Sequence, residues 1–176
     1  MSLNRHMTRV FVFGTSLTAI FTIARAQTPD QVHPDAPILS RQIDAAVTRF
    51  AERGGEYVLG PNDCSIFVID FLKACGKPVK RRYTTGDFWK PSVMGGLKMK
   101  PTKLGVTEHA VFVTRYINAK GRWVGHCGVV LTRNGETIFI HNSEASGGVV
   151  VEPSLSFEGR MLSVDVTLRD MRFFTP

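Results

Sequence analysis

The sequence predicts an α+β fold in which N-terminal helices pack on an antiparallel β-sheet. Two segments with apolar residues at helical spacing come first, and five runs of alternating apolar residues follow them. Such a separation of helices from strands is typical of α+β proteins. The chain has 176 residues, of which 43% are hydrophobic, so it is long enough for one hydrophobic core and too short for two. We therefore expect a single domain over residues 40–176.

Residues 1–26 are typical of a secretory signal peptide. A basic flank precedes an uncharged and mostly apolar run from Val10 to Ala24, which is short for a membrane span. Ala24-Arg25-Ala26 then offers small residues at the two positions that a signal peptidase reads. We expect cleavage after Ala26, with an uncleaved anchor as the alternative. The mature protein would be periplasmic or extracellular and not stably inserted in a membrane.

The chain carries a formal net charge of +7, which falls to +4 once the three arginines of the signal peptide are removed. Its most basic stretches are Lys77–Tyr83 and Leu97–Lys103. Such runs suit an acidic polymer, whether nucleic acid, anionic lipid or cell-wall glycopeptide, and they are also typical of a solvated loop. Because export is expected, nucleic acid is the weakest of these partners, and we predict no nucleic-acid binding.

Two helices are predicted ahead of the strands. Residues 27–39 contain three prolines and are expected to form an extended lead-in. Ser40 can cap the first helix, whose apolar residues recur at helical spacing until Gly54-Gly55 ends it. Asn62 or Asp63 can cap the second helix, which is apolar over most of its length.

Residues 77–106 are expected to be largely irregular, with at most one helical turn, because Gly, Pro and charged residues interrupt any apolar period. Alternating apolar residues then predict five strands: His109–Ile117, Trp123–Leu131, Glu136–Asn142, Gly148–Glu152 and Met161–Arg169.

Asn134-Gly135 is the strongest turn signal in the sequence, since a type I′ hairpin turn needs positive φ at both of its central residues. A two-residue loop at this point fixes the strand register by counting outward. The expected pairs are Arg133–Glu136, Leu131–Ile138, Val130–Phe139 and Gly128–His141. His126 and His141 then share one face of the hairpin, one diagonal step and roughly 7–8 Å apart between backbones. Gly128 leaves room for the two imidazoles to approach each other.

The chain has three cysteines, so at least one thiol stays unpaired within a monomer. Cys64 and Cys75 are eleven residues apart, or about 16 Å on one helix, which is too far for a disulfide. A Cys75–Cys127 bridge is an open alternative. Two buried free thiols are favoured, because free cysteine packs as a small apolar residue.

Cys64 is the candidate nucleophile. In the first turn of a helix its thiolate would face unpaired N–H groups and the positive end of the helix dipole, both of which lower the pKa of a thiol. A nucleophilic cysteine also needs an imidazole to hold its proton and a group to orient that imidazole, and His126 and His141 fit these roles. The same three side chains could instead bind zinc, although their spacing matches no established zinc motif.

Four segments of this sequence resemble the motifs of one known family, the NlpC-type cell-wall peptidases, which are papain-like cysteine hydrolases. Asp63-Cys64-Ser65, followed by Phe67-Val68, resembles the D-C-S-G-[FL]-V signature around the nucleophile. Gly125–Leu131 resembles the H-V-G-I-Y-L strand that carries the base. Phe139–Ser143 resembles the F-I-H-A-S strand that carries the third catalytic residue, and Tyr57–Gly60 is similar to the Y-x-W-G-G segment whose tyrosine lines the substrate site.

The resemblance covers residues 57–143 and keeps the family's order of Cys, His and His, while Ile66 stands where the family has glycine. It implies a papain-like fold and a secreted cysteine peptidase or amidase. It implies three catalytic residues: Cys64, His126 and His141. It implies three substrate-binding residues: Tyr57, Asp63 and Ser65.

The implied substrate is a peptidoglycan peptide, cleaved through a cysteine thioester, for example between D-glutamate and the diamino acid. Neither a cofactor nor a metal is implied. Two other functions stay open on the sequence, a non-catalytic exported wall-binding module and a Cys/His metal-binding protein. The scissile bond and any inhibitor or immunity partner are not specified by the sequence.

Overall fold

A computed structural model of the chain describes residues 38–117, 120–133, 135–162 and 170–176. The predicted signal peptide and residues 27–37 of the predicted lead-in lie outside the described residues. None of the described helices is long and apolar enough to cross a membrane.

The α+β class is confirmed, and a six-stranded antiparallel sheet with strand order β1-β6-β2-β3-β4-β5 forms its centre. The strands are β1 (Lys100–Thr102), β2 (His109–Ile117), β3 (Trp123–Arg133), β4 (Glu136–Ser143), β5 (Gly148–Pro153) and β6 (Arg172–Thr175). The helices are α2 (Ile38–Glu52), α3 (Cys64–Ala74), α4 (Thr85–Phe88), α5 (Pro91–Gly96) and α6 (Ser154–Leu162), with a 3₁₀ turn η1 (Glu144–Ser146) between β4 and β5.

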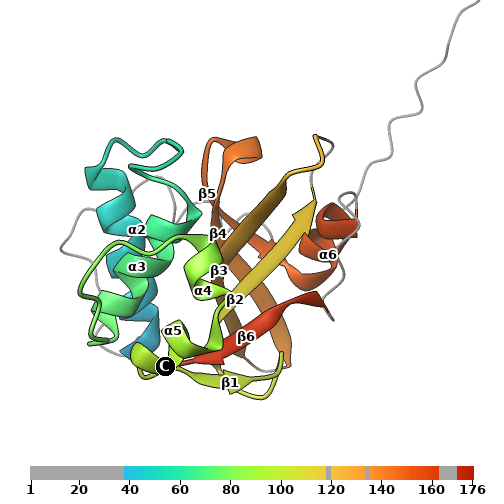
Figure 1. Cartoon of the computed structure of the whole chain (residues 1–176). Coiled ribbons are helices and arrows are strands. Elements are labelled where there is room, and N and C mark those ends of the chain that lie inside the picture. The colour runs from blue at the N-terminus through green and yellow to red at the C-terminus, as the bar shows by residue number, and fades with distance from the viewer. Residues whose placement is uncertain (1–37, 118–119, 134, 163–169) are drawn as a thin grey trace, which may run out of the picture. The chain divides into compact units, whose positions relative to one another are not determined.

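Helices cover both faces of this sheet (Figure 1). The helices α2 to α5 share a core with one face, whereas α6 packs on the other. Alternate residues of β2 therefore enter different cores: Val111 and Val113 belong to the first, and Ala110 and Phe112 to the second. Because side chains alternate along a strand, a strand covered on both faces is apolar at nearly every position. This explains why the first six residues of β2 are all buried.

The two predicted helices are present. α2 begins at Ile38, so Ser40 lies inside the helix rather than at its N-cap. α3 begins at Cys64 with Asp63 as its N-cap, in agreement with the prediction. Four large apolar side chains of α3 are fully buried: Phe67, Val68, Phe71 and Leu72. α3 packs between α2 and strands β3 and β4, which places the start of this helix next to the central strands.

The hairpin has the predicted register. Arg133 pairs with Glu136, so the loop has two residues; Gly135 has φ +80°, and Asn134 lies outside the described residues. The ladder continues through the pairs Thr132–Thr137, Leu131–Ile138, Val130–Phe139 and Val129–Ile140.

Residues 77–106 contain more regular structure than predicted, namely α4, α5 and β1. α4 has only four residues and is held by a capping box, in which Thr84 and Asp87 each bind the other's backbone N–H. Helices this short contain no repeat of apolar residues, so a period-based prediction misses them.

The predicted strand Met161–Arg169 is wrong at its start, because Met161 and Leu162 end helix α6, and residues 163–169 lie outside the described residues. Phe157 and Met161 are four residues apart, lie on one face of α6 and are buried against the sheet. The last strand, β6, was not predicted; it pairs with both β1 and β2.

Candidate active site

The turn before α3 is held by the side chain of Asp63. Its Oδ1 accepts hydrogen bonds from the N–H of Ser65 at 2.9 Å, the N–H of Ile66 at 3.1 Å and the Ser65 hydroxyl at 2.6 Å. Its Oδ2 accepts from the N–H of Gly60 at 2.9 Å. Asp63 and Ser65 are buried, so the structure assigns them to capping the helix that carries Cys64. Their contact with substrate stays a prediction.

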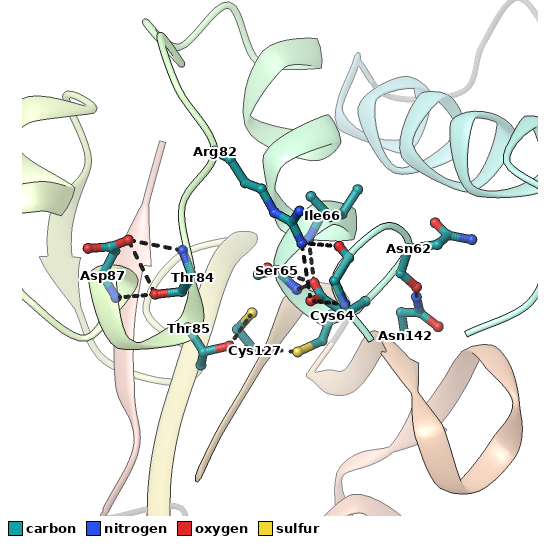
Figure 2. Close-up of polar contacts among 12 residues, drawn as sticks. Asn62, Cys64, Ser65, Ile66, Arg82, Thr84, Thr85, Asp87, Cys127 and Asn142 are labelled. Atoms are coloured by element: carbon teal, nitrogen blue, oxygen red, sulfur yellow. Dashed lines mark hydrogen bonds and ion pairs between the residues drawn. The ribbon is translucent and has the colours of Figure 1, made fainter. Parts of the chain in front are cut away.

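Two longer-range contacts fix this turn (Figure 2). Arg82 donates to the carbonyl of Gly60, and its guanidinium lies 3.8 Å from Oδ2 of Asp63. Asn142 of β4 donates from Nδ2 to the carbonyl of Asn62 at 2.6 Å. One arginine of the predicted basic stretch therefore braces the turn before Cys64, and β4 is tied directly to the same turn.

The sulfur of Cys64 lies where α3, α4 and β3 meet (Figure 2). Sγ is 3.7 Å from Oγ1 of Thr85, and the same hydroxyl is 3.9 Å from Sγ of Cys127. A glycine in β3 permits this approach, since a Cβ at Gly125 would lie 2.6 Å from Cγ2 of Thr85. Thr85 therefore bridges the two sulfurs.

Cys64 has an acidic thiol. The neighbouring Cys127, His126 and Thr85 hold the pKa of Cys64 well below the ordinary value of a thiol, and together they outweigh burial, which raises it. Burial raises the pKa of Cys127 well above its ordinary value, so Cys127 keeps its proton. Since the thiolate is the nucleophilic form of cysteine, the lowered pKa favours the reactive form of Cys64.

His126 and His141 are brought together. Nε2 of His126 lies 2.8 Å from Nδ1 of His141, and the two rings are perpendicular. Gly128 leaves the space for His141, since a Cβ at this position would lie 2.5 Å from Cβ of His141 and 2.6 Å from Cε1 of Phe112. Because Nε2 of His126 is occupied by His141, Nδ1 is the ring nitrogen of His126 left for another partner.

A charged pair lies behind His141. Arg160 of α6 places NH2 2.7 Å from Nε2 of His141 and 2.6 Å from Oε2 of Glu152 in β5. Its NH1 donates to the Ser143 hydroxyl at 3.3 Å. Glu152 Oε2 is itself 3.8 Å from Nε2 of His141. A chain of polar contacts thus runs from His126 through His141 to this pair.

Tyr57 lies half-buried beside the site. Burial, together with the nearby charges of Cys64 and Asp63, raises the pKa of Tyr57, so its hydroxyl keeps its proton. Its backbone N–H donates to the carbonyl of Gly147 at 2.9 Å, which fixes the loop against the turn after β4. The role of Tyr57 in substrate binding stays a prediction.

The alternative of a zinc site is not favoured. Both ring nitrogens of His141 have partners, Nδ1 with His126 and Nε2 with Arg160. Within the part of the chain that the structure describes, no group of three or more His, Cys, Asp or Glu side chains could hold a metal ion.

Cys64, Cys75 and Cys127 are all free thiols, so the Cys75–Cys127 bridge is not formed.

Burial of His141 predicts a loss of stability in acid. Burial, with the nearby charges of His126 and Arg160, lowers the pKa of His141 from 6.5 to about 4. Between these values the unfolded chain binds a proton that the folded chain does not. The contribution of His141 to the free energy of unfolding is therefore complete above about pH 6.5 and is lost as the pH falls through 4, by up to about 3 kcal/mol.

Urea unfolding of the wild type and of His141→Gln at intervals from pH 7 to pH 4 would measure this difference. The wild type should lose more stability than the variant over that range. Parallel curves of stability against pH for the two proteins would contradict the attribution of this acid sensitivity to His141.

Comparison of the chain with family models, with curated proteins and with solved structures gave no match. The geometry of the described residues therefore carries the functional argument together with the motifs of the sequence.

Sequence reasoning missed four side chains of this site: Thr85, Cys127, Glu152 and Arg160. Thr85 lies in the segment expected to be irregular, and Cys127 was expected only to fill space in the core. Glu152 and Arg160 carry no motif, because their relation to His141 depends on how α6 folds back over the sheet. Of these four residues, only Cys127 could have been noticed in the sequence, because it directly follows the candidate base His126 in a predicted strand.

Proposed function

We propose that this chain is an exported cysteine peptidase or amidase with a papain-like fold that hydrolyses amide bonds in peptidoglycan peptides. The observation that carries the proposal is the position of Cys64 at the start of α3, where α3, α4 and β3 meet, together with the 2.8 Å contact between His126 of β3 and His141 of β4. The neighbouring His126 also helps to lower the pKa of Cys64. This order of nucleophile, base and third residue supports acyl transfer through a covalent intermediate. The substrate class rests on the resemblance of the sequence motifs to NlpC-type peptidases.

In the proposed reaction the Cys64 thiolate attacks the carbonyl carbon of the scissile amide. The negative charge then moves to the carbonyl oxygen, where the backbone N–H of Cys64, in the first turn of α3, could donate to it. His126 protonates the leaving nitrogen as the C–N bond breaks, which leaves a thioester on Cys64. His126 next takes a proton from water, the hydroxide attacks the thioester, and the C–S bond breaks. The thiolate and the protonated His126 are regenerated.

Digestion of purified peptidoglycan tests this proposal. Wild-type protein and Cys64→Ala are incubated with sacculi of several wall types, and the soluble products are identified by mass spectrometry. We expect peptide fragments with new termini from the wild type and none from Cys64→Ala, because without a sulfur no thioester can form.

Cys75→Ala is the matched control, since Cys75 lies at the far end of α3 and outside the site. It should cleave like the wild type. Equal cleavage by Cys64→Ala, or no cleavage by the wild type with any wall type, would contradict the proposal. Binding without cleavage would favour the wall-binding module instead.

A further inference from the structure

Both ring nitrogens of His141 are engaged, and their partners determine where its single proton lies. Arg160 donates only, because a guanidinium keeps its protons in proteins and has no acceptor. Nε2 of His141, 2.7 Å from Arg160 NH2, must therefore accept. His141 is fully buried and has a pKa of about 4, so at neutral pH it carries one proton, which this arrangement places on Nδ1.

A proton on Nδ1 makes His141 the donor to Nε2 of His126, 2.8 Å away. His126 must then keep its own proton on Nδ1. A protonated His126 needs the opposite arrangement, in which His126 Nε2–H donates and His141 Nδ1 accepts. That requires the proton of His141 to lie on Nε2 and to find an acceptor there.

Glu152 is the acceptor available at that position. Its Oε2 lies 3.8 Å from Nε2 of His141, and in the structure it instead accepts from Arg160 at 2.6 Å. His141 and Arg160 hold the pKa of Glu152 below its usual range, so the carboxylate is charged at neutral pH. One guanidinium nitrogen therefore occupies the position through which His141 and Glu152 would bond.

In the described part of the chain, the charged groups that act on His141 come from three elements: His126 of β3, Glu152 of β5 and Arg160 of α6. The remaining ring contacts of His141, with Phe112 and Phe157, are apolar. The competition for Nε2 is thus between one donor, Arg160, and one acceptor, Glu152.

We propose that Arg160 and Glu152 are positioning residues that set the tautomer of His141 and, through it, the proton on His126. With Arg160 on Nε2, His141 donates to His126 and opposes its protonation. With Glu152 on Nε2, His141 accepts from His126 and stabilises the protonated form that must release the leaving amine. The catalytic consequence rests on the proposed function, whereas the tautomer of His141 does not.

The direct test is ¹⁵N NMR of the full-length protein labelled at its histidine rings, at neutral pH. The ¹⁵N shifts of the ring distinguish a protonated nitrogen from an unprotonated one. We expect the proton of His141 on Nδ1 in the wild type, in Arg160→Lys and in Glu152→Gln. In Arg160→Met, which removes the donor at similar length, the proton should move to Nε2. A wild-type proton on Nε2, or an unchanged pattern in Arg160→Met, would overturn the proposal.

The pH profile of peptide hydrolysis gives a second readout. If Glu152 and Arg160 were merely structural, their variants would not shift the alkaline limb of this profile in opposite directions. Glu152→Gln should move the alkaline limb to lower pH, and Arg160→Met should move it to higher pH, each by about one unit. Shifts in the same direction, or no shift in Glu152→Gln, would also overturn it. If Arg160→Met fails to fold, the wild-type ¹⁵N shifts of His141 and the alkaline limb of Glu152→Gln still decide.

Glu158→Gln is the matched control, because Glu158 is on the same helix but bonds to the Ser154 hydroxyl at 3.0 Å. Glu158→Gln should leave both the tautomer of His141 and the alkaline limb of the pH profile unchanged. If neither the wild type nor any variant cleaves peptidoglycan, the proposed function fails. The NMR result still shows whether the tautomer of His141 is the proposed one.

Discussion

Replacing His126 with alanine is expected to lower the rate of peptide hydrolysis by about 10³-fold, within the range of about 10²–10⁴-fold that general acid–base catalysis contributes. Two effects combine in this loss. The leaving amine has no proton donor, and Cys64 loses one of the neighbours that lower its pKa. The Cys64 thiol should therefore ionise at higher pH in His126→Ala than in the wild type. Both quantities are measurable, the first from product formation and the second from the pH dependence of thiol alkylation.

Free imidazole provides the control for His126→Ala. His126→Ala removes only the imidazole and leaves Cys64 and His141 in place. Added imidazole should therefore restore part of the activity to His126→Ala and none to Cys64→Ala. An unchanged rate in His126→Ala would remove His126 from the mechanism.

Gly128→Ala is expected to destabilise the fold by about 1–3 kcal/mol and to abolish activity. The added Cβ would lie 2.5 Å from Cβ of His141, 2.6 Å from the carbonyl oxygen of Ile140 and 2.6 Å from Cε1 of Phe112. The carbonyl oxygen of Ile140 belongs to the sheet backbone and Cβ of His141 is attached to it, so neither atom can move aside at low cost. Relief of the clash must separate β3 from β4, and this would break the 2.8 Å hydrogen bond between His126 and His141.

Gly159→Ala is the matched control for this change. It lies in α6, and a Cβ there would meet no atom within 4 Å. Alanine favours a helix over glycine by about 0.5–1 kcal/mol, so Gly159→Ala should be as stable as the wild type or slightly more stable. Urea unfolding measures both variants. If Gly128→Ala proved as stable as Gly159→Ala, the claim that close packing at Gly128 brings the two histidines together would be contradicted.

Much of the fold could be predicted because the signals were local. β2 has its predicted bounds, since a strand buried on both faces is bordered by charged and polar residues. The register of the hairpin followed from one Asn-Gly pair, and the start of α3 from one capping aspartate. The proximity of His126 and His141 was then a matter of counting along the strands.

The parts that could not be predicted depend on contacts between distant segments. The alternating apolar residues from Met161 onward are typical of a strand, but Phe157 and Met161 cover the second face of the sheet as a helix. β6 is defined by its pairing with β1 and β2, which a short run of residues does not reveal. For the same reason neither Thr85 nor Arg160 could be assigned to the site, since the folding of α4 and α6 onto the sheet places them there.

The central claim is that Cys64 is an activated nucleophile, and the pH dependence of its alkylation tests this without any assumption about substrate. The full-length protein is treated with iodoacetamide from pH 4 to pH 10, and modification of each cysteine is followed by peptide mass spectrometry. Cys75 serves as the control within the same molecule, because burial raises its pKa to about 11. We expect Cys64 to react rapidly at neutral pH with an ionisation well below about 8.5, the ordinary pKa of a thiol, while Cys75 stays unmodified. A Cys64 that ionises at or above 8.5, or that reacts no faster than Cys75 at pH 7, would contradict the account.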